Sequence, residues 1–405
     1  MVAPWNLNTV LSGLSDVQFE PLLSLSIKWL TLKTIFLVAI SSARRKRLIS
    51  QQGYPSENYE VVTEDGYILT VNRIPHGIKN QSGGTKPVVL LQHGLLMDAS
   101  NWVTNFEYNS LGFILADAGY DVWMGNSRGN TWSMKHKTLS PADSEFWAFS
   151  FDEMANKDLP AVIDFILQKT GQKQLYYIGH SQGTTMGFIA FSTIPELASK
   201  IKLFFALAPV ATVKYPIGPA AAARSLPTYL VKPLFGDKMF MPQPRITKLL
   251  SNRFCSHDLL DVLCGNFFFL LCGFNEQNLN MTRVDVYVSY FPSSTSVQNM
   301  EHWLQASHTG RLQAFDWGFL GNLERYKQST PPLYDVTKMT VPTALWSGGN
   351  DWLADPLDVK LLIPKIKNLV YQEEIPKWEH LDFIWGINAP QKLYKKILNF
   401  LKRHA

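Results

Sequence analysis

Short, continuously apolar runs that alternate with helical stretches constrain the fold of this chain more than any other feature. Residues 87–92 and 175–178 form such runs, and a turn that contains glycine follows each of them. Residues 111–118 and 151–168 instead carry apolar side chains at helical spacing. A strand without polar alternation is buried on both faces, as in a parallel sheet covered by helices. The pattern therefore predicts an α/β fold with a mostly parallel central sheet.

The alternation extends along the chain and is interrupted once. It also predicts a hairpin at 59–71, strands at 120–124, 202–207, 341–346 and 369–373, and helices at 184–192, 358–366 and 391–402. Residues 211–334 contain helical patches without buried-strand runs. We therefore expect a core formed by residues 53–210 and 335–405, with 211–334 inserted as a largely helical cap.

Composition and charge exclude nucleic acid as a partner. The chain is 46% hydrophobic, which is enough to bury at least one large core. It has 38 Lys and Arg against 33 Asp and Glu, a formal net charge of +5. That balance is too mild for a nucleic-acid-binding protein. Nothing in the sequence indicates a cofactor or an obligate protein partner.

The three cysteines fall in one short stretch. Cys255, Cys264 and Cys272 have no neighbouring His or Cys that completes a zinc pattern, so no metal site is expected. Cys255 and Cys264 bracket a loop short enough for a disulfide, which would leave Cys272 over and indicate an oxidising compartment. Three buried free thiols are the alternative.

Residues 1–52 form an atypical N-terminal segment. A secretory signal has a basic region, an apolar run and a cleavage site with small residues. Here residues 1–22 contain Asp16, Glu20 and two prolines, and the apolar stretch 29–40 is interrupted by Lys33. This stretch is shorter than the roughly 20 apolar residues of a membrane span. We expect a displaced signal or an altered start.

The pentapeptide Gly179-His180-Ser181-Gln182-Gly183 lies between a predicted buried strand and a predicted helix. This is the sequence context of a G-x-S-x-G nucleophile elbow. A serine in a tight strand-to-helix turn needs neighbours without side chains, so that its hydroxyl can project into a cleft. Ser181 is therefore the predicted nucleophile.

A serine nucleophile requires a base, and the base requires a group that orients it. Downstream of Ser181, Asp351 follows a predicted strand and His380 lies in the loop after the next one. The carboxyl ends of parallel strands meet at one edge of a sheet, which would bring both residues to Ser181. Asp355 is the rival acid, and Asp351 is preferred because it comes directly off the turn.

Ester hydrolysis also needs donors for the developing oxyanion. In an elbow of this kind one donor is the backbone N–H after the nucleophile, here Gln182. The second comes from an early loop, and the loop at residues 93–96 makes Leu95 the candidate. Separately, Asn80 and Asn280 begin triplets that fit the N-glycosylation pattern.

Taken together, six stretches resemble the acid lipase family, which includes gastric and lysosomal lipases. They are residues 64–67, 93–96, 116–131, 179–184, 348–351 and 380–383. The similarity runs from about Gly53 to the C-terminus. It implies an α/β-hydrolase fold in which a mobile lid lies within the cap. It also implies secretion or a lysosomal location.

The resemblance assigns roles to individual residues. The family's triad maps onto Ser181, Asp351 and His380, and its oxyanion residues map onto Leu95 and Gln182. Its disulfide maps onto Cys255 and Cys264, which leaves Cys272 free.

The sequence thus predicts a serine lipase that cleaves triacylglycerols or sterol esters at a lipid–water interface through an acyl-enzyme. Two alternatives stay open. One is a carboxylesterase or thioesterase that acts on soluble esters, and the other is a non-catalytic lipid binder. A rate that does not depend on a lipid–water interface would favour the soluble esterase. Lipid binding without labelling by a serine-directed phosphonate would favour the non-catalytic binder.

Overall fold

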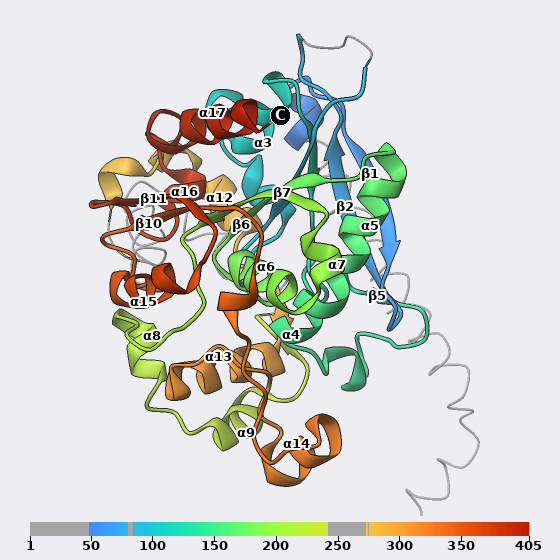
Figure 1. The fold of residues 1–405 in the computed structure, drawn as a ribbon, viewed down its shortest axis with the longest axis vertical. Helices are drawn as coiled ribbons and strands as arrows, with labels where there is room; N and C mark the ends of the chain where they lie inside the picture. The colour runs from blue at the N-terminus through green and yellow to red at the C-terminus, as the bar shows by residue number, and fades with distance from the viewer. Residues whose placement is uncertain (1–47, 80–83, 242–272, 274, 405) are drawn as a thin grey trace, which may run out of the picture. The chain divides into compact units, whose positions relative to one another are not determined.

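A nine-stranded sheet is the centre of the described part of the chain (Figure 1). The computed structural model describes residues 48–79, 84–241, 273 and 275–404. The strands are β1 (Glu57–Val62), β2 (Tyr67–Ile74), β3 (Val88–Gln92), β4 (Asp121–Met124), β5 (Lys135–His136), β6 (Leu175–His180), β7 (Ile201–Leu207), β10 (Thr343–Gly348) and β11 (Leu369–Ile375). Their order is β1-β2-β4-β3-β6-β7-β10-β11, and β5 pairs with β2.

The pairing confirms the predicted α/β fold. Strands β4, β3, β6, β7, β10 and β11 pair in parallel, while β2 pairs antiparallel with β1, β4 and β5. The hairpin expected at 59–71 is β1 and β2, with Val62 opposite Ile68. In the parallel part, every residue of β3 and β6 is buried, as their unbroken apolar runs predict.

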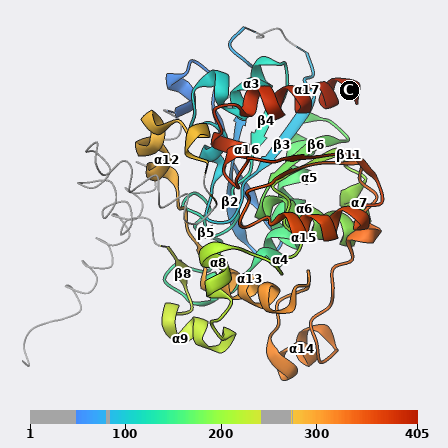
Figure 2. The ribbon, with the colours of Figure 1, turned by 90° about the vertical axis from the view of Figure 1, so that its left-hand side faces the viewer.

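Successive residues of the central strands contribute to two different cores. Val89 and Leu91 pack in one core with residues of α3 (Leu111–Asp117) and α17 (Lys395–Arg403), whereas Val88 and Leu90 pack in the other with α5 (Leu159–Thr170) and α6 (Gln182–Thr193). Side chains alternate between the two faces of a strand, so helices must cover both faces. Figures 1 and 2 show α3 and α17 together on one side of the sheet and α5, α6 and α7 (Pro195–Ala198) on the other.

Two of the predicted helices are interrupted by π-helical turns. The helix expected at 151–168 is α4 (Phe151–Glu153), a π-helix at Met154–Asp158 and then α5. A π-helix at Pro390–Tyr394 likewise precedes α17. A π turn adds one residue to a helical turn, and the apolar pattern on either side of it stays helical. The spacing of apolar residues therefore does not reveal it. The remaining helices beside the late strands are α15 (Pro356–Leu362) and α16 (Asp382–Trp385).

The described residues of 211–334 add no strand to the main sheet. Their helices are α8 (Gly218–Ala223), α9 (Val231–Phe235), α12 (Val284–Tyr290), α13 (Val297–Thr309) and α14 (Gly318–Tyr326). A small antiparallel sheet of β8 (Met239–Phe240) and β9 (Thr295–Ser296) was not predicted, because two-residue strands leave no periodic pattern. Helices α8, α9, α13 and α14 gather at one end of the molecule in both views (Figures 1 and 2). The boundaries of the cap as a domain stay a prediction.

None of the helices in residues 48–79, 84–241 and 275–404 combines the length and the apolarity needed to cross a lipid bilayer.

Arg128 ties the early hairpin to the π-helix before α5. Its side chain is 1% exposed and forms ion pairs of 2.7 Å with both Asp158 and Asp65. The guanidinium also lies 4.0 Å from the centre of the Tyr67 ring. A buried charge is tolerated only when it is paired and hydrogen-bonded, and here two carboxylates supply that pairing.

A second buried polar cluster joins α4 to the segment after α13. Asp152 accepts hydrogen bonds from the Phe315 backbone N–H at 2.8 Å and from the Tyr334 hydroxyl at 2.9 Å. His302 on α13 lies 2.9 Å from the Ser150 hydroxyl. Burial raises the pKa of Asp152 to about 7 and lowers the pKa of His302 to about 3. Both side chains are therefore uncharged in mildly acidic solution.

Asp152 and His302 change the stability of the fold with pH in opposite directions, and substitution of Asp152 isolates its contribution. Between about pH 4 and pH 7 the unfolded chain gives up the Asp152 proton that the folded chain keeps, so the contribution of Asp152 to the free energy of unfolding falls as the pH rises through this window. From near pH 5 to near pH 8 we expect Asp152 alone to contribute a loss on the order of 3 kcal/mol, and the lowered pKa of His302 to offset part of it below about pH 6.5. Asp152→Asn, which is neutral at every pH, should reduce this loss in denaturant titrations. An unchanged pH dependence in the variant would contradict the assignment.

Candidate active site

Ser181 occupies a strained turn between β6 and α6. Its φ is +53° and its ψ is −121°, a backbone conformation that residues other than glycine rarely adopt. The backbone is held on both sides, because the Ser181 N–H donates to the Leu207 carbonyl at 3.0 Å and the Ser181 carbonyl accepts from the Thr184 N–H at 2.8 Å. A conformation of this kind costs on the order of 1–3 kcal/mol, which the surrounding bonds must offset. The turn predicted from the pentapeptide is therefore present.

Glycines permit the close packing around this turn. A Cβ on Gly183 would lie 2.4 Å from the Gln92 carbonyl oxygen, and a Cβ on Gly94 would lie 2.9 Å from the Ser181 Cβ. Both distances are shorter than a van der Waals contact. Consequently the end of β3 and the loop after it lie directly against the elbow.

His380 bridges Ser181 and Asp351. Its Nε2 lies 2.7 Å from the Ser181 Oγ, and its Nδ1 lies 2.8 and 3.0 Å from the two carboxylate oxygens of Asp351. A carboxylate only accepts, so Nδ1 carries the proton and Nε2 is left to accept from the hydroxyl. The structure thus brings together all three residues that the sequence singled out.

Asp351 rather than Asp355 is the carboxylate at His380. Asp351 is fully buried and also accepts from the backbone N–H groups of Leu353 and Ala354 at 2.9 and 2.8 Å. These bonds fix the direction of its carboxylate. Asp355 instead caps α15 by accepting from the Leu357 N–H at 2.7 Å.

Two further carboxylates fix the loop that carries His380. Asp382 accepts from the Glu379 N–H at 2.7 Å and from the side chains of Asn275 and Asn278 at 2.7 and 2.6 Å. Burial raises the pKa of Asp382 to about 6. Burial and the neighbouring Asp382 raise the pKa of Glu379 well above its usual range. Sequence reasoning missed these contacts because nothing local links residues 275–278 to residue 382.

Two more histidines lie near the nucleophile, and both are buried. His180 Nε2 lies 2.9 Å from the His380 carbonyl, so it can donate to that oxygen. His93 Nε2 accepts from the Ser127 N–H at 3.0 Å. Burial lowers the pKa of both rings, and His380 lowers that of His180 further. The neutral rings of His93 and His180 can therefore hydrogen-bond to the neighbouring backbone without placing a positive charge beside His380.

The two predicted oxyanion donors lie on segments that meet at Ser181. Gln182 is the first residue of α6, where a backbone N–H has no acceptor within the helix. Leu95 follows Gly94 in the loop against the elbow, and Leu96 has a φ of +57°. The assignment of Leu95 and Gln182 as donors stays a prediction.

The side chain of Gln182 has contacts that the sequence did not indicate. Its Oε1 accepts from the Asn299 amide at 3.0 Å and from the Trp303 indole N–H at 2.8 Å. Both partners lie on α13, four residues apart and therefore on one face of that helix. This four-residue spacing is visible in the sequence, but any half-buried helix has the same spacing. It does not by itself identify Gln182 as the partner.

Of the remaining predicted residues, Asn280 does not join this site. Asn280 begins a short 3₁₀ turn and its side chain accepts from the Thr282 N–H and hydroxyl. Asn80 and the three cysteines, Cys255, Cys264 and Cys272, lie outside the described residues, as does most of the segment 1–52. Within the described residues, no three His, Cys, Asp or Glu side chains are grouped to hold a metal ion.

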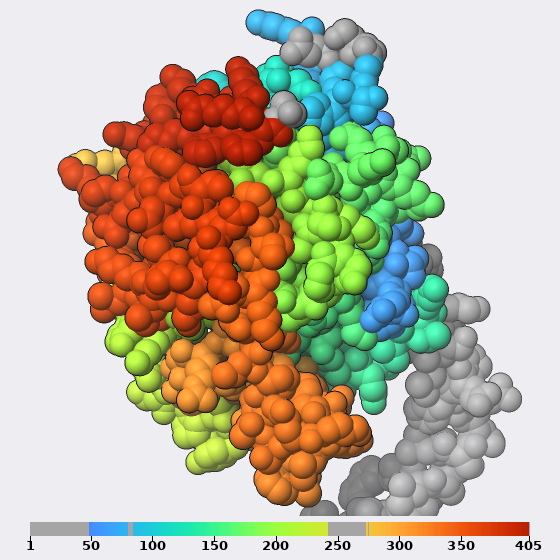
Figure 3. Space-filling model, in the orientation of Figure 1, coloured from blue at the N-terminus to red at the C-terminus, as the bar shows by residue number. Residues whose placement is uncertain are grey.

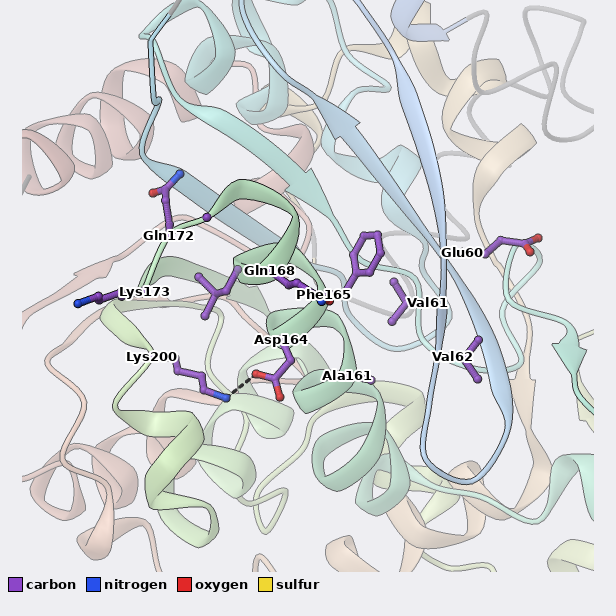
Figure 4. Close-up of a pocket in the computed structure, with 12 residues that line it drawn as sticks. Glu60, Val61, Val62, Ala161, Asp164, Phe165, Gln168, Gln172, Lys173 and Lys200 are labelled. Atoms are coloured by element: carbon purple, nitrogen blue, oxygen red, sulfur yellow. Dashed lines mark hydrogen bonds and ion pairs between the residues drawn. The ribbon is translucent and has the colours of Figure 1, made fainter.

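A surface hollow of about 850 Å³ lies between β1 and α5 (Figure 4). Val61 and Phe165 form part of its wall, and Asp164 pairs with Lys200 at one edge. None of the residues that line it belongs to the triad, to the oxyanion candidates or to their hydrogen-bond partners. We therefore place the functional site at Ser181.

Known families match most of the chain. The model of the alpha/beta hydrolase fold matches residues 87–387, and that of a partial alpha/beta-hydrolase lipase region matches residues 46–106. A solved structure from Acinetobacter baumannii AYE is 15% identical, covers 90% of this chain and 96% of its own, and has a TM-score of 0.52. That likeness shows the fold alone.

Relatives of high identity are lipases. Lysosomal acid lipase/cholesteryl ester hydrolase of Homo sapiens is 64% identical over 359 residues, which are 88% of this chain and 90% of that protein. Lipase member M of Mus musculus is 60% identical, with 88% and 85% covered. Gastric triacylglycerol lipase of Homo sapiens is 58% identical, with 88% and 90% covered. The chain therefore belongs to the α/β-hydrolase fold family and, within it, to the lipases that include the lysosomal acid and gastric enzymes.

Proposed function

We propose that this chain hydrolyses the ester bonds of triacylglycerols or sterol esters through an acyl-enzyme on Ser181. The observation that carries the proposal is the continuous hydrogen-bonded chain from Asp351 through His380 to the Ser181 hydroxyl. The names of the relatives, which include cholesteryl ester hydrolase and triacylglycerol lipase, support neutral lipids as the substrate class.

In the proposed reaction, Ser181 Oγ attacks the ester carbonyl carbon while His380 Nε2 takes the hydroxyl proton. The carbonyl oxygen becomes negative and is stabilised by the N–H groups of Leu95 and Gln182. Collapse of this intermediate breaks the bond to the alcohol, which leaves with the proton from His380. Water then attacks the acyl group with His380 as base, and the fatty acid departs from Ser181. Asp351 holds His380 in the required tautomer and stabilises its charged form.

Substitutions in the triad test this reaction. We expect Ser181→Ala to lower kcat on a long-chain ester by about 10⁶-fold, and Asp351→Asn to lower it by about 10⁴-fold because it stabilises the wrong tautomer. Asp355→Asn is the matched control, since Asp355 caps α15 and does not touch His380. Its kcat should stay near that of the parent protein.

The assays use emulsified triolein, emulsified cholesteryl oleate and a short soluble ester at acidic and neutral pH. Parental hydrolysis by the Ser181→Ala protein would refute the proposal. A rate that ignores the emulsion and favours the soluble ester would instead identify a soluble esterase.

We also propose that α14 contacts the lipid–water interface. It exposes Phe319, Leu320 and Leu323, which are 64%, 78% and 39% accessible. Their spacing places them on one helix face. Exposed apolar faces of this kind bury in the outer layer of a lipid surface. Figure 3 shows this part of the chain, in orange, protruding at the lower edge of the molecule.

Helix α9 carries further exposed apolar side chains at this end of the molecule. It carries Leu234 and Phe235, 61% and 51% exposed, and lies at the same end of the molecule as α14 in both ribbon views. An insoluble substrate is presented at an interface, so a lipid surface is the partner that fits this end.

Charged substitutions on α14 test the interface. The double variant Phe319→Glu and Leu320→Glu should bind emulsified triolein at least about 10-fold more weakly, because each apolar side chain is worth more than 1 kcal/mol when buried. Its kcat on a soluble ester should not change. Ile78→Glu is the control, since Ile78 is 42% exposed and follows β2, outside α9 and α14. Equal emulsion binding by both variants would contradict this surface.

We propose a lysosomal or secreted location. The names of the relatives support it, and the raised pKa values of Asp152 and Asp382 suit an acidic environment. The full chain expressed in cultured cells should appear in the lysosomal fraction or the medium and lose mass on treatment with N-glycosidase. Asn280→Gln should reduce that loss of mass. A protein found only in the cytosol and unaffected by the glycosidase would contradict the proposal.

A further inference from the structure

Helix α13 reaches the elbow through two side chains. Trp303 Nε1 lies 2.8 Å and Asn299 Nδ2 lies 3.0 Å from the same atom, Gln182 Oε1. The indole N–H can only donate, which fixes the side-chain oxygen of Gln182, and not its nitrogen, toward α13. The Gln182 nitrogen then points to the Met154 sulfur at 3.3 Å. Every polar atom of this side chain is therefore held by a partner.

Gln182 is also the residue whose backbone N–H follows the strained nucleophile. It is 2% exposed and begins α6 directly after Ser181. A strained backbone persists only where surrounding contacts over-determine it. The peptide between Ser181 and Gln182 is held at its carbonyl, which accepts from the Thr184 N–H at 2.8 Å and from the Thr184 hydroxyl at 2.6 Å. The two hydrogen bonds on the Gln182 side chain hold the same peptide from its other end, at the Gln182 Cα.

We propose that Asn299 and Trp303 are positioning residues that fix the Gln182 N–H toward the developing oxyanion. This inference rests on the proposed hydrolase function and adds a contribution from the 211–334 segment to it. An oxyanion donor stabilises the transition state only within a narrow range of distance and angle. A small rotation at Gln182 therefore costs rate without loosening the binding of the uncharged ester.

The position of α13 is itself fixed. The Ser296 hydroxyl accepts from the Asn299 N–H at 2.9 Å at the start of the helix, and the Asn299 amide also donates to the Thr295 hydroxyl at 3.1 Å. Further along, the Phe151 ring lies 4.8 Å from the Trp303 ring. These contacts let α13 act as a rigid support for Gln182 rather than as a mobile neighbour.

The test uses Trp303→Phe, which removes the indole N–H and keeps an aromatic ring beside Phe151. Trp317→Phe is the matched control, because Trp317 lies in the same segment and its N–H donates to the Tyr326 hydroxyl at 3.2 Å. On a soluble short ester we expect Trp303→Phe to lower kcat about 10-fold with KM unchanged. The affinity for a trifluoromethyl ketone, which forms a tetrahedral adduct with serine, should fall by a similar factor. Trp317→Phe should alter neither.

Asn299→Ala provides a second measurement at the other hydrogen bond, and it should show the same split between kcat and KM. The melting temperatures of Trp303→Phe and Trp317→Phe should agree, which separates positioning from loss of structure. A kcat for Trp303→Phe equal to that of Trp317→Phe overturns the inference, and so does a raised KM at unchanged kcat. Ser181→Ala is assayed alongside: if it keeps full activity the proposed function fails, whereas if it is inactive those results refute the positioning role alone.

Discussion

The strained backbone of Ser181 is the constraint on which the rest of the site depends. A positive φ at a residue with a side chain persists only where neighbouring contacts prevent relaxation. Those contacts come from β7 and from the first turn of α6, and the neighbouring glycines permit the close packing. The parallel sheet supplies this support because β6 lies between β3 and β7, with both neighbours buried. The nucleophile is thus a product of the sheet order, not of the pentapeptide alone.

The sequence predicted the elements that have a strong local signal. Unbroken apolar runs identified β3 and β6, and the position of Asp351 after a strand and of His380 after the next one placed both beside Ser181. Long-range side-chain contacts were not predictable. Asn278 lies far along the chain from Asp382, and Trp303 from Gln182, so no periodic pattern links either pair. The π-helix at Met154–Asp158 was also missed, because its apolar spacing imitates an ordinary helix.

The segment between β7 and β10 contributes to the site in two chemically different ways. Asn275 and Asn278 hold the Asp382 carboxylate, which in turn holds the loop of His380. Helix α13 contacts the other side of the reaction centre, at Gln182. Side chains of the segment between β7 and β10 therefore support both the base and the proposed oxyanion donor. Changes in that segment are expected to affect the rate as well as the choice of substrate.

The ion pairs of Arg128 limit how the sequence of this chain can vary. Its guanidinium satisfies Asp158 and Asp65 at once and lies over the ring of Tyr67. Lysine carries the same charge but has a single compact ammonium, which cannot form a planar fork between two carboxylates. Lysine therefore cannot replace Arg128 without loss of one of its two ion pairs. An uncharged residue at position 128 would leave two carboxylates without a partner, so Asp65 and Asp158 would have to change with it. Three positions far apart in the sequence are therefore expected to vary together.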